Sequence, residues 1–331
     1  MTGFRVDPWD PAYGSSADDL TESQAEVDAE AEVAEAGWAP IDPGPAPAPS
    51  AVLFADGVRR LDARVWFDPA GPGVPEPGVC ASLAAGVVCS CPAGAHLAAV
   101  EVQRVVAATR ADLDDLATPV GTYAAQPVTR VAGSEPSSLV VQRVQSCLAG
   151  LEAATVRGAR QPGSGCHSGP DDLLVVDGPL RFHADLPRAV GFIKAHHAAY
   201  LPDHLSSVVA SLGPGQRTPV FGLGTRWRRY SWYLRLPGPA TGWWAGVVRV
   251  EASERLDPAA ACRLANLTAQ VLPRYASVEY KDPRAPQNLY PVAGLERQLR
   301  RRLGDLGLVQ RALRAAGNRD GTGSGVTSGA H

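Results

Sequence analysis

Short apolar runs alternate with turn residues along most of the chain, and this pattern predicts strands. Such runs occupy residues 51–56, 58–67, 83–92, 97–106, 173–177, 189–193, 217–222, 229–236 and 244–251. Apolar positions at spacings of three and four predict helices instead. These helices cover residues 138–157, 202–212, 258–272 and 292–315. Strands that come first and then alternate with helices indicate an α/β fold with a mixed central sheet flanked by helices.

Two of the predicted strands run into an Asp-Gly pair, at Asp56-Gly57 and at Asp177-Gly178. A carboxylate at the end of a buried strand is costly unless it has a partner such as a metal, a cation or backbone donors. Two such ends would place two carboxylates at one rim of the sheet, which favours a site for divalent metals and phosphate chemistry. Asp-Gly is also a good turn dipeptide, so either pair alone would indicate a turn.

Further candidate site residues lie near these pairs in the predicted elements. Glu152 sits at the margin of the apolar stripe of the 138–157 helix, from which it could reach inward as a third acid or simply face solvent. Lys194 ends the 189–193 strand, where its ammonium could neutralise a phosphate or merely terminate the strand. Carboxylate oxygens suit magnesium or manganese. We expect a surface position for His196 and His197.

Cations and aromatic side chains alternate between Arg226 and Arg235. This pattern is typical of proteins that stack the bases of single-stranded nucleic acid and hold its phosphates. The alternative is that the aromatic side chains belong to the core and the arginines to its rim. A basic turn near the C-terminus would suit a phosphate backbone as well. The candidates for nucleic-acid contacts are Arg226, Arg228, Arg229, Arg284, Arg300 and Arg301.

Composition adds a domain organisation to this picture. The chain has 331 residues, of which 45% are hydrophobic and 20% charged, and its formal net charge is −3. Residues 7–42 contain eleven acidic side chains, so the remainder is net basic and suits a polyanionic partner. Because residues 1–50 are acidic and end in a proline-rich run, we predict that they are disordered. We predict the same for residues 317–331, which leaves a folded body at 51–316.

The chain has no apolar stretch near the roughly 20 residues of a membrane span and no signal-peptide pattern, so a cytoplasmic location without a membrane partner is expected. Its six cysteines are expected to be reduced. Cys80, Cys89, Cys91 and His96 invite a zinc interpretation. Their spacing does not match the familiar zinc knuckles and the cysteines lie in an apolar strand, so we do not predict zinc there.

Taken together, these segments resemble the NurA nuclease family. The most specific stretch runs from Lys281 through Pro291 to Glu296 and resembles the C-terminal signature of bacterial members. Three further stretches, 54–57, 175–180 and 190–194, match in the same order. The resemblance covers the body from 51 to 316.

The resemblance implies an RNase H-like fold and a DNA nuclease, an exonuclease with possible single-strand endonuclease activity, that needs manganese or magnesium and uses two ions. It implies Asp56, Glu152 and Asp177 as metal ligands and as catalytic residues, with Lys194 and Arg284 holding phosphate charge. Archaeal members carry a histidine after their Tyr-Pro segment; here none follows before the tail, so Asp282 or Asn288 is expected to substitute.

Family members form homodimers and work with the hexameric HerA ATPase in resecting double-strand breaks, so the resemblance implies these partners in DNA repair. A second hypothesis is a catalytically inactive RNase H-like subunit that binds DNA or docks on the translocase, since the histidine is missing. A third, a glycosidase with paired carboxylates, would need no metal, but the many arginines argue against it.

Overall fold

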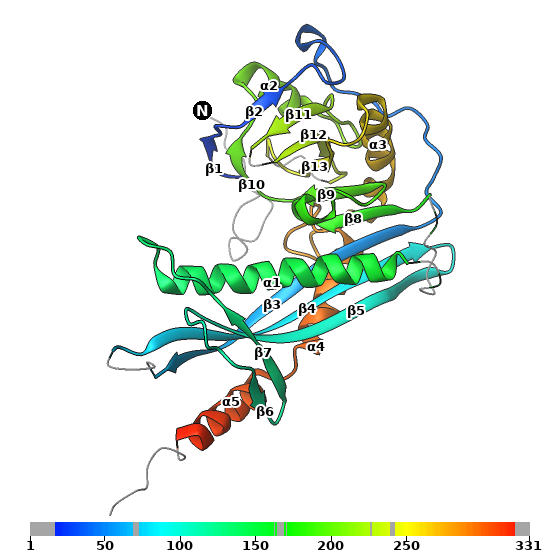
Figure 1. Ribbon diagram of the computed structural model, residues 1–331. Coiled ribbons are helices and arrows are strands. Elements are labelled where there is room, and N and C mark those ends of the chain that lie inside the picture. Colours follow the sequence, from blue (N-terminus) through cyan, green and yellow to red (C-terminus); the bar gives the residue numbers. More distant parts are fainter. Residues whose placement is uncertain are drawn as a thin grey trace, which may run out of the picture. The chain divides into compact units, whose positions relative to one another are not determined.

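The structure is a computed structural model that describes residues 17–68, 73–161, 163, 169, 171–225, 227–238 and 242–321 (Figure 1). The chain divides into two compact units. The first is made of Met1–Ala55, Val88–Ala98 and Arg160–Gly294, and the second of Asp56–Val87, Ala99–Ala159 and Leu295–His331. Within the described residues, no helix combines the length and the apolar character that crossing a bilayer requires.

The first unit is built on a mixed sheet whose strand order is β2-β11-β12-β13-β9-β8-β3. Its elements are β1 (Ala17–Glu22), β2 (Glu26–Asp28), η2 (Glu35–Gly37), the start of β3 (Val52–Phe67), β8 (Leu173–Asp177), η3 (Arg181–His183), β9 (Ala189–Ile193), β10 (His196–Ala199), α2 (Asp203–Ser211), β11 (Phe221–Gly224), β12 (Arg228–Arg235), β13 (Val247–Ser253), α3 (Pro258–Val271) and η4 (Leu272–Tyr275). Strand β8 runs parallel to β3 and to β9, and the strands from β9 to β2 pair in antiparallel fashion.

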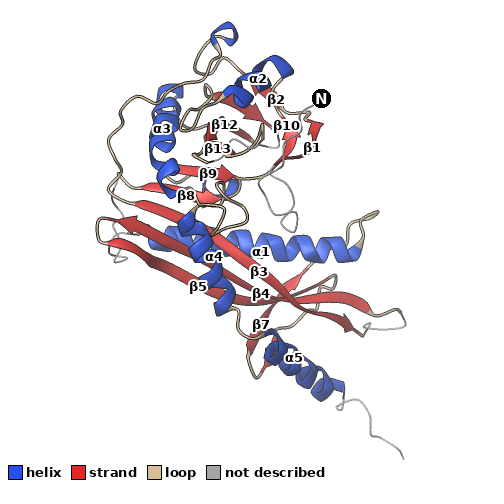
Figure 2. Cartoon of the chain, turned by 180° about the vertical axis from the view of Figure 1, so that it is seen from behind, coloured by secondary structure: helices blue, strands red, loops and turns tan. Residues whose placement is uncertain are grey.

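Helices cover both faces of this first sheet. On one face, Leu264 of α3 packs with Trp232 and Val250 in the core. On the other, Leu205 of α2 packs with Tyr233, the neighbour of Trp232 in β12. Successive side chains of a strand point to opposite faces, so the apolar run in β12 serves both cores. The confirmed architecture is therefore an α/β fold with helices on a mixed sheet (Figure 2).

The second unit continues β3 into a sheet with the order β3-β4-β5-β7-β6. Its elements are β3, β4 (Glu76–Cys91), β5 (Gly94–Ala108), β6 (Leu116–Thr118), β7 (Gly121–Pro127), α1 (Pro136–Ala159), most of α4 (Tyr290–Arg302) and α5 (Leu306–Gly321). Helix α1 lies along the strands, and its Val144 packs with Val79 and Val105. Val309 of α5 packs with Val106, the neighbour of Val105, so α1 and α5 cover opposite faces.

Several predicted elements are confirmed. The helices expected at 138–157, 202–212 and 258–272 are α1, α2 and α3. Asp257 caps α3, because its carboxylate accepts a hydrogen bond from Ala260 N at 2.9 Å. The sequence pattern therefore identified the amphipathic helices well.

Other predicted elements are wrong. The hairpin expected at 51–67 is one continuous strand, β3, and the single helix expected at 292–315 is two, α4 and α5. The second of these begins at Leu306 because Asp305 caps it, accepting from Leu308 N at 2.8 Å. Strands β6 and β7 were not predicted.

The described part of the acidic segment is ordered, so the prediction of disorder for residues 1–50 is wrong there. Glu32 accepts two hydrogen bonds of 2.7 Å from Arg217, whose side chain is 1% exposed. Burial alone would raise the pKa of Glu32, but the hydrogen bonds from Arg217 and from the Val220 backbone hold it below its ordinary value. Trp38 is also buried. Composition missed this contact because Glu32 has a specific partner, Arg217, far along the chain. Residues 317–321 of the predicted tail lie in α5, and the rest of it lies outside the described residues.

Candidate functional site

A cavity of about 530 Å³ opens in the first unit where β8 and β9 end. Side chains of one acid and several potential cations line it. The ionisable and phenolic lining residues are Asp177, Lys194, His197, Tyr200, Arg249 and Arg284. The carboxyl ends of parallel strands are the usual place for a ligand in an open α/β sheet. The cavity therefore combines one carboxylate with a surplus of positive charge.

Asp177 is the last residue of β8, and its two oxygens have different surroundings. Oδ2 accepts a hydrogen bond from Lys194 Nζ at 2.7 Å, and both side chains are 14% exposed. Oδ1 is buried without a hydrogen-bond partner among the described residues. A buried carboxylate oxygen without a partner is costly unless a cation or a donor occupies its lone pairs. Asp177 is therefore suited to hold a metal ion.

Lys194 is held in place from the other side by the segment 282–288. Its Nζ also donates to Asn288 Oδ1 at 3.1 Å. Asn288 Nδ2 in turn donates to Asp282 Oδ2 at 2.7 Å, and Asp282 Oδ1 accepts from Arg284 N at 2.8 Å. Both oxygens of Asp282 thus accept hydrogen bonds, and Asp282 does not line the cavity. It orients Asn288 and Lys194 and lies behind them.

Arg249 is a cavity residue that the sequence analysis missed. It lies in β13 and donates to Glu251 Oε1 at 3.0 Å, and its guanidinium lies 4.5 Å from the centre of the Tyr200 ring. Burial alone would lower the pKa of Arg249, but Tyr233 and Glu251 outweigh it and raise the pKa above its ordinary value. An arginine and a glutamate inside the apolar run 247–252 were the available signal, since buried charges are paired or functional.

The arginines predicted to contact nucleic acid lie in different environments. Arg284 lines the cavity, while Arg228 is exposed and pairs with Glu26 at 3.1 Å. Arg229 is wrong as a candidate, because it is 5% exposed and donates to Glu251 at 2.6 Å. Arg300 and Arg301 are exposed on α4 in the second unit.

Two details complete the outcome for this basic and aromatic stretch. Arg226 lies outside the described residues. Trp232 and Tyr233 are buried in the cores on opposite faces of the first sheet. The alternative that these aromatic side chains belong to the core is therefore confirmed for both of them.

Asp56 and Glu152 belong to the second unit, where one glycine connects them. Asp56 lies within β3, and its Oδ1 accepts from Gly57 N at 2.7 Å. A Cβ at residue 57 would lie 2.0 Å from Glu152 Oε1, so the Glu152 carboxylate rests directly on the Gly57 backbone. Glu152 therefore reaches the strand position next to Asp56.

Strand register relates the positions of the two Asp-Gly pairs along their strands. In the first unit β3 and β8 are parallel, with Ala55 opposite Val176. Asp56 and Asp177 are the next residues in the two strands. The convergence of Asp56, Glu152 and Asp177 on shared ions stays a prediction.

The two neighbouring histidines lie in different environments. His197 is exposed and lines the cavity, as a surface position predicts. His196 is buried, against expectation, and one of its ring nitrogens lies 3.1 Å from Val247 O. Burial lowers its pKa to about 4. The two side chains point to opposite faces because they are successive residues of β10.

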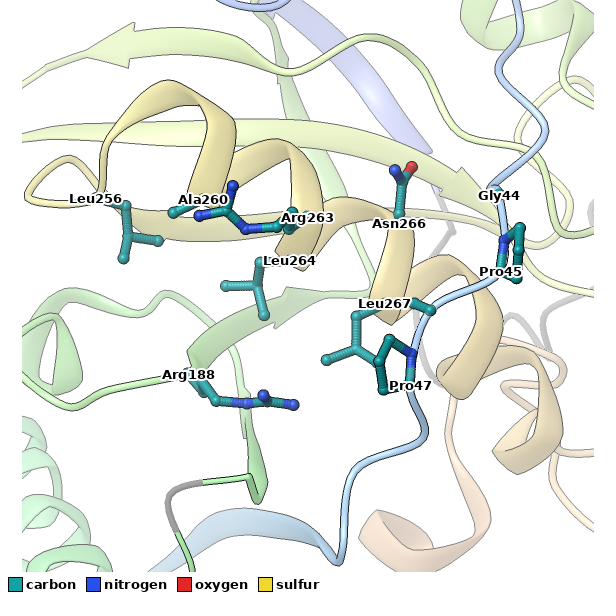
Figure 3. A pocket seen from close by; sticks show the side chains of 11 residues that line it. Gly44, Pro45, Pro47, Arg188, Leu256, Ala260, Arg263, Leu264, Asn266 and Leu267 are labelled. Carbon is teal, nitrogen blue, oxygen red and sulfur yellow. The ribbon is translucent and has the colours of Figure 1, made fainter.

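A second cavity in the first unit, of about 500 Å³, has a different character (Figure 3). It lies between residues 44–47 and α3, where Leu264, Leu267 and the two prolines Pro45 and Pro47 form apolar walls. Arg188 also lines it. None of the predicted site residues that the structure describes is among its lining residues. The acidic chemistry therefore belongs to the first cavity.

The sequence matches no protein-family model and no curated protein. Among solved structures, the NurA nuclease from Sulfolobus solfataricus is similar to this chain, with a TM-score of 0.46 and 11% sequence identity. The similarity covers 84% of this chain and 88% of that one. A likeness at this level carries no functional weight, so function has to be argued from the residues of the cavity.

Proposed function

We propose that this protein is a metal-dependent nuclease that hydrolyses phosphodiester bonds of DNA at the cavity beside Asp177. The observation that carries the proposal is the buried Asp177 Oδ1, which has no hydrogen-bond partner among the described residues and belongs to a cavity that is otherwise rich in cations. An acid that can hold a metal beside cations that can hold a phosphate is the combination that phosphoryl chemistry needs.

Asp177 fits a magnesium or manganese ion because it offers an oxygen donor in a site that also holds water-accessible space. We propose Asp56 and Glu152 as further ligands; the support is the sequence resemblance and, within the second unit, the packing of the Glu152 carboxylate on the Gly57 backbone beside Asp56. Bound divalent ions in such sites supply an activated water and stabilise the departing oxygen.

The cations of this chain would bind and orient the substrate. Lys194, fixed between Asp177 and Asn288, points its ammonium at a defined position where negative charge can be held. Arg249, fixed by Glu251 and Tyr200, and Arg284 supply further permanent positive charge on the cavity wall. Preorganised donors of this kind stabilise charge that develops on a phosphate.

We also propose that the substrate is DNA at its ends and that the protein works in break repair as a homodimer with a HerA-type hexameric ATPase. The support for this finer statement is the sequence resemblance of residues 281–296, which contribute Asn288 and Arg284 to the Lys194 network and the cavity.

The test is digestion of linear DNA by the full-length protein with manganese or magnesium, with and without a chelator. Asp177→Asn is expected to lower the rate by on the order of 10³-fold or more, because it removes the charge of the metal ligand with almost no change in shape. The matched control is Asp171→Asn, whose side chain is 76% exposed. Equal digestion by Asp177→Asn and the unmodified protein, or digestion that survives the chelator, would refute the proposal.

A further inference from the structure

The tip of the β4–β5 hairpin brings together three metal-binding side chains outside the cavity. Strand β4 ends at Cys91 and β5 begins at Gly94, so Pro92-Ala93 is a two-residue turn. Gly94 has a φ of +104°, a conformation that residues with a side chain rarely adopt. The ligand atoms of Cys89, Cys91 and His96 all lie within 4.8 Å of one another.

The register of the hairpin explains this convergence. Cys89 and Cys91 are two residues apart in a strand, so their side chains share one face. A two-residue turn that pairs Cys91 with Gly94 places His96 opposite Cys89. The same register recurs further along the hairpin, where the Cβ position of Gly86 lies 3.1 Å from Ala99 O. Residues directly opposite in antiparallel strands also share a face, so all three ligands do.

Hydrogen bonding prepares His96 for ligation. His96 Nδ1 lies 3.4 Å from Gly94 O, and a proton on Nδ1 leaves the lone pair on Nε2. Metal-bound histidines usually donate their other ring nitrogen to a carbonyl or carboxylate in this way. Cys91 Sγ also lies 3.7 Å from Gly94 O. The carbonyl at the positive-φ glycine thus orients two of the three ligands.

We propose that Cys89, Cys91 and His96 bind one thiophilic divalent cation, zinc by ligand type, with a water completing a tetrahedral site. Two thiolates and one neutral imidazole balance the charge of a divalent ion. Zn–S bonds of about 2.3 Å and Zn–N bonds of about 2.0–2.1 Å put ligand atoms roughly 3.5–3.8 Å apart, within reach of the observed cluster by small side-chain rotations. The hairpin residues 86–98 include no lysine or arginine that would compete for the thiolates.

The burial of the three ligands, which lie in the first unit, suits a metal site that is open on one side. Cys89 is fully buried, Cys91 is half-buried and His96 is exposed, so an ion can enter from the His96 side. Cys80, the fourth residue in the original zinc interpretation, is not part of the cluster. It is fully buried in the second unit, and burial raises its pKa to about 12, which keeps it a thiol. None of the three ligands lines the Asp177 cavity, so the site is separate from the proposed nuclease function.

The test is a titration of the chelator-treated, reduced full-length protein with Co²⁺, followed by displacement with Zn²⁺. We expect the thiolate-to-cobalt charge-transfer absorption that two cysteine ligands produce, and we expect this absorption to saturate at one equivalent per chain. Cys91→Ser and His96→Ala, at positions that are not fully buried, should each weaken Co²⁺ binding by on the order of 100-fold. Such a loss is larger than most losses of metal affinity caused by changing a residue that only supports a ligand. Circular dichroism checks that both variants remain folded.

The matched controls are Cys147→Ser, at another half-buried thiol, and His204→Ala, at another exposed histidine. Both should bind Co²⁺ like the unmodified protein. The proposal is wrong if the unmodified protein gives no thiolate–cobalt absorption, or if Cys91→Ser and His96→Ala bind as tightly as the controls. Asp177→Asn separates the two proposals, because it should lose nuclease activity and keep the thiolate–cobalt absorption of the hairpin site.

Discussion

Asp56-Gly57 and Asp177-Gly178 are the same dipeptide after similar apolar runs, yet one continues a strand and the other ends one. Residues 56 and 57 lie within β3, which extends from Val52 to Phe67. At the second pair β8 stops at Asp177, and Gly178 has a φ of +104°. The first glycine is needed because Glu152 rests on it, and the second because the chain turns there.

The difference teaches that an Asp-Gly pair permits either a continuing strand or a turn, and that contacts with residues elsewhere in the chain decide which of the two forms. Asp177 gains a direct partner from Lys194, seventeen residues away, and Lys194 gains one from Asn288. Asp56 instead accepts from the backbone N–H of its own neighbour, Gly57. If both acids nevertheless serve one metal site, changes at the two pairs should have matching effects on metal binding.

The largest expected effect tests that match directly. Asp56→Asn should reduce manganese-dependent digestion by on the order of 10³-fold, the loss also expected for Asp177→Asn, if the two acids share ions. Each variant should also lose the rise in melting temperature that manganese gives the unmodified protein, since a ligand that binds only the folded state stabilises it. Asp114→Asn, at an exposed aspartate of the second unit, is the control. If manganese raises the melting temperature of Asp56→Asn normally but not that of Asp177→Asn, the metal is bound by Asp177 and not by Asp56.

The next effect is a loss of folding stability at acid pH, and we expect it in the first unit, which contains both Asp177 and His196. His196 has a folded pKa of about 4 against about 6.5 unfolded, so between these values only the unfolded chain takes up the proton. Stability should therefore fall as pH drops from about 6.5 to about 4, by roughly 3 kcal/mol in total, and be unaffected by this group above pH 7.

This change in stability is measured by unfolding the protein in urea at pH 7.5 and at pH 5, with tryptophan fluorescence as the signal of unfolding. Trp232 is buried in the first unit, whereas Trp66 of the second is 68% exposed, so the signal reports mainly on the first unit. His196→Gln should flatten the pH dependence, and His204→Gln at an exposed site should not. If the free energy of unfolding of His196→Gln changes between pH 7.5 and pH 5 as much as that of the unmodified protein, His196 is not the cause of the pH dependence. If that variant does not fold, an NMR titration of His196 in the unmodified protein tests whether its pKa is lowered.

The smallest effects come from replacing the two glycines. Gly57→Ala places a methyl group where the Glu152 carboxylate now lies, so the carboxylate must move. A displacement near 1 Å costs about 100-fold in rate when geometry is critical. In Gly178→Ala the added Cβ meets no described atom within 4 Å, but the positive φ costs about 1–3 kcal/mol.

Rate and melting temperature together separate the two glycine variants. Gly57→Ala should lose more activity than stability, and Gly178→Ala more stability than activity. The reverse ordering would show that Glu152 has no part in the chemistry.

Much of the local structure could be predicted from the sequence because it depends on near neighbours. The apolar spacing of α1 and the Asp257 cap of α3 are examples. Of the site residues, Asp177, Lys194 and Arg284 were predicted and do line the cavity. Arg249 was missed because it comes to the cavity only once β13 has paired with β9, where Arg249 lies opposite Ile193. Arg229 was wrongly chosen because it is buried against Glu251 of the neighbouring strand β13.

The sequence by itself determined the fold class, the amphipathic helices and the acids that follow apolar runs, since periodicity and side-chain chemistry are local properties. Only the tertiary structure decided that the acidic segment is ordered through Glu32 and Arg217, and that β3 continues through Asp56. It also brought Cys89 and Cys91 to His96, which their spacing had argued against. These outcomes depend on contacts between residues far apart in the chain or across a turn, and such contacts exist only once the strands have paired.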